Sequence, residues 1–234
     1  MKYGIIAAGE GSRLTQEGVK IPKPLVSVKG MPLIERLIGI FVRNNAESIS
    51  IIINSHQPQT KAFLEELQKS HPIDIVVKDT PSSMHSMYAL SEHLKGGKFC
   101  LTTVDTIFNE EEFKMYIEEF SKTECNGVMA VTDYIDDEKP LYVSTDESLY
   151  ITGFHDYAPV NARYISGGIY ALDDRALETL STCIANGSSR MRNFQRQLIA
   201  DGLSLKAYPF GKIIDVDHVE DIEKAEELIS QQWK

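Results

Sequence analysis

The chain has 234 residues, enough for one large domain with a sizeable core, and its composition is that of a globular protein. No apolar run reaches the roughly 20 residues of a membrane helix, and no secretory signal follows Met1, so we expect a cytoplasmic protein without a membrane partner. The formal net charge of -10 argues against wrapping nucleic acid, which needs many Lys and Arg side chains. Three cysteines far apart in the sequence show no metal-ligand spacing and are expected to be reduced thiols.

Short apolar strands alternate with amphipathic helices along the chain, which predicts an α/β sheet with helices on its faces. The predicted strands of the first half cover residues 3–8, 50–54, 73–77 and 98–104. One predicted helix of this half begins at Pro32, and three others cover residues 58–70, 84–94 and 110–120. In the second half we expect strands at 127–132, 141–144, 149–154, 164–172, 205–208 and 212–216. Helices are expected at 174–184, at 191–201 and from Val219 onward.

The first strand ends in small residues followed by cations: Ala7-Ala8-Gly9-Glu10-Gly11-Ser12-Arg13-Leu14, with Lys23-Pro24-Leu25 nine residues later. Small residues let the backbone approach a phosphate or a base, and Arg13 and Lys23 supply positive charge. A dinucleotide-binding loop would need a third glycine near Leu14, a helix directly after the glycines and an acidic residue closing the next strand. We expect none of these, because the chain runs on through the helix breakers Gly18, Pro22 and Pro24. A P-loop would need Gly-Lys-Ser/Thr, which is absent. The remaining alternative is a tight turn whose cations are merely solvated.

On this motif and its spacing, the chain resembles the sugar-phosphate nucleotidylyltransferase family and the phosphocholine cytidylyltransferases of the same scaffold, from its first residues to its last helix. The resemblance implies one domain over residues 1–234 with a three-layer α/β/α, Rossmann-like (GT-A-like) fold and a mixed, mainly parallel sheet. The nucleotide-binding half would cover about residues 1–120 and the acceptor-binding half 121–234.

The family also implies an activity: transfer of a nucleoside monophosphate from a nucleoside triphosphate to a phosphorylated acceptor, releasing pyrophosphate, with Mg²⁺ as cofactor. By this resemblance Arg13 meets the departing phosphates, and Lys23 bridges the α-phosphate and the acceptor. The small residues of the loop are expected to contact the nucleotide: Ala7, Ala8, Gly9, Gly11 and Ser12.

Two acidic positions are candidate metal ligands, since hard cations prefer oxygen ligands. Asp105 ends an apolar strand, and in the resembling family an Asp at this place binds magnesium. The alternative is that Asp105 simply begins a turn, as Asp often does after a strand. Asp215 and Asp217 follow a later apolar run, and alternation puts both on one side of an extended segment. Asp217 is the favoured ligand and Asp215 the second choice. With Glu220, Asp217 also fits a capping box for the last helix.

A loop of small residues around Pro81 lies where the family contacts base and ribose, and Ser83 or Ser86 is a candidate nucleotide contact. Ordinary N-capping by Ser82 or Ser83 is the alternative. His85 is not assigned a role, because an acceptor phosphate is already anionic. Gly168 lies in a segment similar to the one that lets the family's acceptor approach the backbone.

The chain departs from the family at the acceptor. Many sugar nucleotidylyltransferases carry a Glu-Lys-Pro run whose lysine meets the acceptor phosphate, whereas the corresponding stretch, residues 154–158, contains no lysine. This departure argues against a standard hexose 1-phosphate, so the candidate acceptors are a sugar 1-phosphate or a phosphorylated alcohol such as phosphocholine. Arg163, Arg190 and Arg192 are candidate substitutes, although such residues are more often solvated.

The sequence argues against two rival functions. A glycosyltransferase that uses a nucleotide sugar usually carries Asp-x-Asp after a strand, and Asp105 has no second Asp two residues away. A catalytically idle nucleotide-sensing protein would be expected to lack Arg13, Lys23 or Asp105, and all three are present. The oligomeric state, the base and the acceptor stay undetermined by the sequence.

Overall fold

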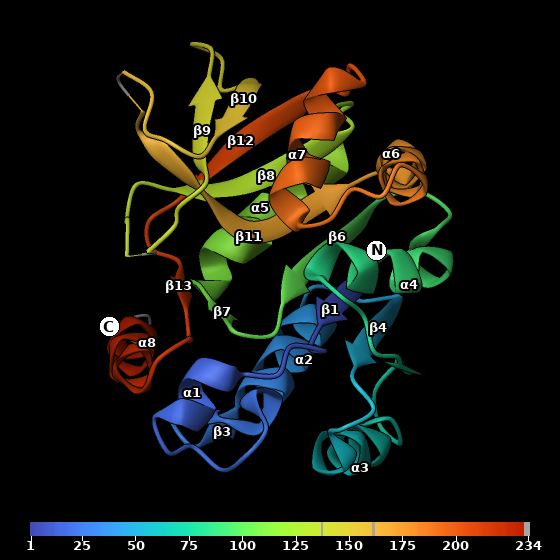
Figure 1. Cartoon of the computed structure of the whole chain (residues 1–234), viewed down its shortest axis with the longest axis vertical. Coiled ribbons are helices and arrows are strands. Elements are labelled where there is room, and N and C mark those ends of the chain that lie inside the picture. Colours follow the sequence, from blue (N-terminus) through green and yellow to red (C-terminus); the bar gives the residue numbers. More distant parts are fainter. Residues whose placement is uncertain (137, 161, 232–234) are drawn as a thin grey trace.

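The computed structural model describes residues 1–136, 138–160 and 162–231, and one large sheet runs through it (Figure 1). The strands of this sheet are β1 (Lys2–Ile6), β4 (Ser48–Ile53), β5 (Ile73–Val77), β6 (Phe99–Thr103), β8 (Gly127–Thr132), β9 (Tyr142–Thr145), β10 (Ile151–His155), β11 (Tyr164–Leu172) and β12 (Leu205–Phe210). Each strand that the sequence predicts for this sheet is present, with its ends shifted by up to two residues.

The sheet is mixed. Its main path runs β10-β9-β11-β6-β1-β4-β5, with β8 beside β11 and β12 beside β8. Every described strand of it except β10 and β11 runs in the same direction. Parallel neighbours need crossover connections, which is why helices alternate with strands in the first half. The predicted mixed, mainly parallel sheet is confirmed.

Helices cover both faces of the sheet, as the three-layer prediction requires (Figure 1). One apolar cluster joins the first face to α2 (Leu33–Arg43), α3 (Pro58–Leu67), α5 (Glu110–Lys122) and α8 (Val219–Gln231). A second cluster joins the other face to α4 (Ser83–Leu94), α6 (Asp174–Ala185) and α7 (Met191–Ala200). Tyr3 and Ile5 belong to the first cluster and Ile6 to the second, because side chains alternate along a strand.

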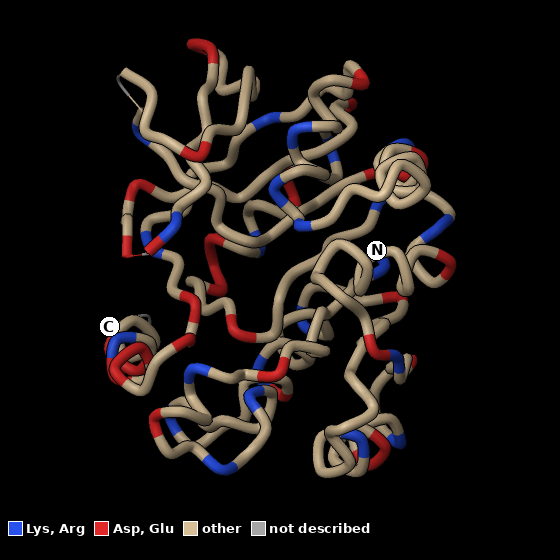
Figure 2. The backbone as a smooth tube through the Cα atoms, in the orientation of Figure 1, with Lys and Arg blue, Asp and Glu red and all other residues tan. Residues whose placement is uncertain are grey.

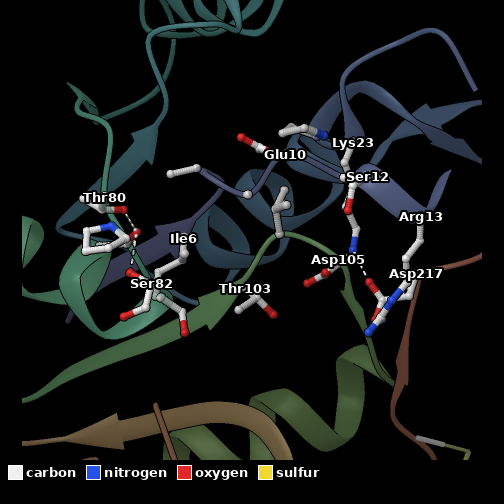
Figure 3. A pocket seen from close by; sticks show the side chains of 18 residues that line it. Ile6, Glu10, Ser12, Arg13, Lys23, Thr80, Ser82, Thr103, Asp105 and Asp217 are labelled. Carbon is white, nitrogen blue, oxygen red and sulfur yellow. Dashed lines mark hydrogen bonds and ion pairs between the residues drawn. The ribbon is translucent and has the colours of Figure 1, made fainter. Parts of the chain in front are cut away.

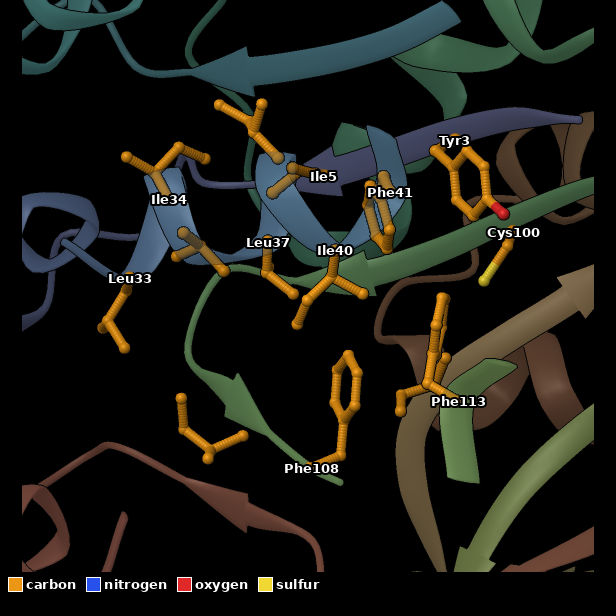
Figure 4. Close-up of a cluster of buried hydrophobic side chains, with 14 of the residues drawn as sticks. Tyr3, Ile5, Leu33, Ile34, Leu37, Ile40, Phe41, Cys100, Phe108 and Phe113 are labelled. Atoms are coloured by element: carbon orange, nitrogen blue, oxygen red, sulfur yellow. The ribbon is translucent and has the colours of Figure 1, made fainter. Parts of the chain in front are cut away.

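Aromatic rings fill the first cluster beneath β1 (Figure 4). The rings of Tyr3 and Phe41 stack with centroids 4.3 Å apart, and Phe108 stacks on Phe113 at 5.0 Å. All four side chains are fully buried, so truncating any of these phenylalanines to alanine should lower the free energy of unfolding by about 3–5 kcal/mol. This packing anchors β1, the strand that leads into the glycine loop. The three cysteines are buried and free, as expected for thiols.

Short elements depart from the prediction. They are α1 (Ser12–Gln16), the 3-10 turn η1 (Lys23–Leu25), β2 (Ser27–Val28), β3 (Met31–Pro32), β7 (Thr106–Ile107) and β13 (Ile214–Asp215). A helix does begin directly after the glycines, contrary to the expectation. Gly11 and Gly18, with φ of 62° and 95°, bracket α1, whose five residues are too few to show a helical period. The expected strand at 212–216 shrinks to β13, which pairs with β7 outside the main sheet.

Charge is distributed unevenly. Lys and Arg lie on helices, strands and loops alike, whereas several Asp and Glu follow one another from β7 into the first turn of α5, beside those that follow β13 (Figure 2). Within the described ranges, no helix has both the length and the apolar content to cross a membrane.

Candidate active site

The glycine loop forms one wall of the site. After β1 the chain runs through Ala8, Gly9 and Glu10 without regular structure and enters α1 at Gly11. A Cβ atom at Gly11 would lie 2.9 Å from the Cβ of Lys23. Glycine therefore serves twice here, since it adopts the left-handed backbone and leaves room for Lys23 to pack against the loop.

Lys23 lies at the centre of a cluster of four charged side chains, the charged cluster (Figure 3). Its amine contacts the carboxylate of Asp105 and lies 2.7 Å from Oδ1 of Asp217. Arg13 Nη1 lies 2.5 Å from the other oxygen, Oδ2 of Asp217. Four separate segments supply these groups: α1, η1, the end of β6 and the segment before α8. Arg13 and Lys23, the two cations expected at the phosphates, thus lie against two of the three expected metal ligands, Asp105 and Asp217.

The cluster holds Lys23 in its charged form. The Lys23 side chain is only 10% exposed, and this burial alone would lower the pKa of its amine. The nearby carboxylates of Asp105 and Asp217 outweigh burial and raise that pKa. Lys23 is therefore a fixed positive charge at neutral pH, which suits a group that must stabilise anionic phosphate oxygens.

A first cavity of about 580 Å³ opens between the glycine loop, the end of β6 and the start of α4 (Figure 3). This volume is in the range of ligand pockets. Among the residues expected to contact nucleotide, its lining includes Ala8, Gly9, Gly11, Ser12 and Ser83. The charged cluster closes one end of it, and the opposite end is uncharged.

Hydroxyl groups dominate that uncharged end. Thr80 Oγ1 and Ser86 Oγ lie 2.6 Å apart, and Ser82 Oγ lies 2.9 Å from Nδ1 of His85. Ser82 is the N-cap residue of α4 but makes no side-chain capping bond. The capping alternative for Ser82 is therefore not realised, and these hydroxyls line the first cavity instead.

A second cavity of about 810 Å³ adjoins the first, and Arg13 and Asp217 line both. Residues of the second half of the chain supply most of its walls, including Tyr134 and Gly167. Seven carboxylate side chains line it: Glu17, Asp136, Glu138, Asp215, Asp217, Glu220 and Asp221. Lys224 is the only lysine of the lining among the described residues, and its amine lies 2.8 Å from Oδ2 of Asp136. The cavity is strongly acidic.

Asp215 and Asp217 both face this second cavity, while Val216 between them is buried, as the alternation predicted. The capping-box alternative for Asp217 is wrong, because its carboxylate faces Arg13 and Lys23. Where α8 begins, the backbone N–H of His218 donates to Asp221 Oδ2 and that of Val219 donates to Glu17 Oε2. Desolvation by the surrounding protein, together with the nearby Asp105 carboxylate, raises the pKa of Asp215 above its ordinary value.

The charged cluster fits a divalent cation in one respect. Asp105 Oδ1 is buried and has no hydrogen-bond partner among the described residues, so it offers a free oxygen ligand. No group of three or more His, Cys, Asp or Glu side chains in the described ranges is arranged to hold a metal ion. The protein would thus contribute only one or two carboxylates, and a bound polyphosphate would have to supply other ligands.

Several predicted residues lie elsewhere. Ala7 is buried in the core and Gly168 lines neither cavity, whereas its neighbour Gly167 lines the second. Gly168 instead has φ of 73° at an irregularity of β11. Arg192 Nη1 pairs with Asp156 at 2.6 Å, and Arg163 packs on the Tyr164 ring. These arginines and Arg190 are absent from both cavity linings, so none replaces the missing lysine there.

Sequence reasoning missed Lys224 and Thr103. Lys224 lies one turn after Asp221 on the same face of α8, and only the docking of that helix brings it to the second cavity. Thr103 ends β6 beside the first cavity, a position at which open α/β sheets bind ligands. For Thr103 the signal was present in the sequence.

The chain belongs to the MobA-like NTP transferase domain family, which it matches over residues 4–199. A 2-aminoethylphosphonate cytidylyltransferase of Lancefieldella rimae is 32% identical over 111 residues, covering 46% of this chain and 44% of that protein. A bifunctional IPC transferase and DIPP synthase of Aquifex aeolicus is 25% identical over 240 residues, covering 96% of this chain and 51% of that protein. The chain spans about half the length of these curated relatives.

Solved structures share the fold. The inositol-1-phosphate CTP transferase of T. maritima superposes with a TM-score of 0.83 at 18% identity, covering 100% of this chain and 96% of that one. A putative glucose-1-phosphate thymidylyltransferase of Bacillus anthracis superposes with a TM-score of 0.85 at 19% identity, covering 97% of this chain and 94% of that one. The CTP:phosphocholine cytidylyltransferase of Streptococcus pneumoniae superposes with a TM-score of 0.78 at 20% identity, covering 97% of this chain and 98% of that one.

Proposed function

We propose that the protein is a nucleotidyltransferase that moves a nucleoside monophosphate from a triphosphate to a phosphorylated small-molecule acceptor and releases pyrophosphate. The observation that carries this proposal is the Lys23 amine, which lies between Asp105 and Asp217 where the two cavities meet. A triphosphate in the first cavity and an acceptor in the second would both have a phosphate at this point. The chain would act as one domain, with its nucleotide half in about residues 1–120.

The reaction asks the protein mainly for position and charge. An oxygen of the acceptor phosphate forms a bond to the α-phosphorus, the bond to the bridging oxygen breaks, and pyrophosphate leaves with that electron pair. Lys23 would stabilise charge on the α-phosphate and the acceptor, and Arg13 would bind the departing phosphates. Magnesium, when bound, would neutralise charge on the triphosphate. Asp105 and Asp217 would hold it, with Asp215 as second choice.

The relatives' names support cytidine triphosphate as donor, because two of them are cytidylyltransferases and a third is a CTP transferase. The second cavity supports an acceptor that carries a positive charge, such as an aminoalkyl phosphonate or a phosphorylated amino alcohol. Its carboxylates outnumber Arg13 and Lys224, and they would attract an ammonium group while Arg13 meets the phosphate. The cytoplasm, which contains the triphosphates and magnesium, is the proposed compartment.

Pyrophosphate release tests the proposal directly. The protein with magnesium is given CTP, ATP, GTP, UTP or deoxythymidine triphosphate, each with 2-aminoethylphosphonate, phosphocholine, inositol 1-phosphate or glucose 1-phosphate. We expect release that requires CTP and is fastest with an amine-bearing acceptor. Release with glucose 1-phosphate alone would overturn the acceptor class, and no release with any pair, despite triphosphate binding, would favour the nucleotide-sensing alternative. Release of free nucleoside diphosphate from a nucleotide sugar would favour the glycosyltransferase.

A further inference from the structure

Two amide side chains behind the glycine loop continue the strand pairing after β1 has ended. Within the sheet, the backbone N–H of Ala7 donates to the carbonyl of Ile52 at 2.9 Å. Beyond that point Asn54 Nδ2 donates to the carbonyl of Ala8 at 3.0 Å, and Gln57 Nε2 donates to the carbonyl of Gly9 at 3.0 Å. Side-chain amides thus replace the backbone donors that a longer β4 would supply.

Both amides are fixed in place. Asn54 is 7% exposed and Gln57 is 6% exposed, and neither lines the first or the second cavity. The Asn54 Oδ1 atom accepts the backbone N–H of His56 at 3.0 Å, so only its Nδ2 end is free to face the loop. Gln57 Oε1 is buried without a partner among the described residues. Burying an unpaired amide oxygen costs free energy of folding. The presence of Gln57 at this position is therefore best explained by the hydrogen bond that its Nε2 donates to the loop.

These bonds set the direction of two peptide planes. In a trans peptide, the C=O of one residue and the N–H of the next point in opposite directions. When the carbonyls of Ala8 and Gly9 point back to Asn54 and Gln57, the N–H groups of Gly9 and Glu10 point away from those amides, and both residues line the first cavity. Neither N–H has a hydrogen-bond partner within the described ranges. Gly9 and Glu10 are both exposed and line that cavity.

We propose that Asn54 and Gln57 are positioning residues that hold the Gly9 and Glu10 N–H groups ready to donate to oxygen atoms of the bound triphosphate. The inference rests on the proposed function, since it needs a triphosphate in the first cavity. The oxygens belong to the phosphates or to the base and ribose, and both sources require the same two donors. Losing a preset donor should weaken triphosphate binding without affecting the acceptor.

The test is the binding of CTP and of inorganic tripolyphosphate, each without acceptor, to Gln57→Met and Asn54→Leu proteins, measured by calorimetry. Gln68→Met is the matched control, because Gln68 Nε2 also donates to a backbone carbonyl, that of Ile73, but far from both cavities. We expect Kd for CTP to rise about tenfold in both variants and to stay unchanged in the control. A parallel rise for tripolyphosphate assigns the donors to phosphate oxygens, and a rise for CTP alone assigns them to base or ribose.

Kinetics separate this role from a general loss of stability. In turnover assays the KM for CTP should rise while the KM for the acceptor stays within about twofold of the parent value. If Gln57→Met fails to fold, Gln57→Glu, which keeps the shape but removes the donor, is measured in its place. Unchanged CTP binding in both loop variants would overturn the positioning role alone. Absence of triphosphate binding in the parent protein would overturn the proposed function as well.

Discussion

The amine of Lys23 lies 2.7 Å from Oδ1 of Asp217, although 194 residues separate the two along the chain. The same amine contacts Asp105, so one buried cation joins the η1 turn to the ends of two different sheets. This contact places a positive charge at the border of the two cavities, where the proposed reaction requires one.

Replacing Lys23 by methionine should lower kcat about a hundredfold or more, because a preset positive charge at the α-phosphate is lost. Pyrophosphate release measures the effect. Lys20→Met is the control, since Lys20 is exposed and lines neither cavity. Full turnover by a folded Lys23→Met protein would remove Lys23 from the reaction.

Asp105→Asn should raise the magnesium concentration needed for half-maximal rate by about tenfold or more, since a neutral amide is a weaker ligand than a carboxylate. Direct binding of Mn²⁺, followed by electron paramagnetic resonance, gives the same comparison without turnover. Asp79→Asn is the control, because the Asp79 carboxylate binds Ser55 outside both cavities. Equal Mn²⁺ affinity in all three proteins would contradict the assignment.

A Cβ atom at Gly9 would meet no protein atom within 4 Å, and Gly9 lines the first cavity. Gly9→Ala should therefore fold with the thermal stability of the parent protein and bind CTP about tenfold more weakly, because the added methyl group occupies ligand space. Thermal unfolding and calorimetry measure the two quantities. Unimpaired CTP binding would show that the ligand stays away from this part of the loop.

The neighbouring Gly11 should respond in the opposite way. Gly11→Ala forces alanine into a left-handed backbone and brings its Cβ to 2.9 Å from that of Lys23. We expect a loss of about 1–2 kcal/mol in the free energy of unfolding, measured by urea denaturation. A variant as stable as the parent would mean that the loop takes another conformation.

Acid should abolish the contribution of Asp156 to stability. The Asp156 carboxylate accepts hydrogen bonds from Arg196 and Arg192, and these hold its pKa below the usual value. A lowered folded-state pKa stabilises the protein above the unfolded pKa of about 3.9, and this stabilisation disappears as pH falls through the folded pKa. Asp156→Asn should thus lower Tm at pH 7 but match the parent protein in strong acid.

The activity of the Asp156→Asn protein should persist, because Asp156 lines neither cavity. A Tm difference that survives in strong acid would exclude the ion pairs as its cause.

Local pattern was enough to predict the strands, the long helices and much of the site. Small residues after an apolar strand, with Arg13 and Lys23 at their spacing, predict a polyphosphate site, and Asp105 follows a strand at the edge where open α/β sheets bind ligands. These features depend on residues close together in the sequence, where periodicity and turn chemistry operate.

Tertiary structure decided the remainder. The direction of the Asp217 carboxylate, the choice of Gly167 over Gly168 at the second cavity and the arrival of Lys224 there all depend on strand order and on how α8 docks. The same holds for Asn54 and Gln57, which reach the glycine loop only because β4 pairs with β1. A single sequence records which face of each element is apolar. It does not record which elements become neighbours, since that is determined by the packing of the whole chain.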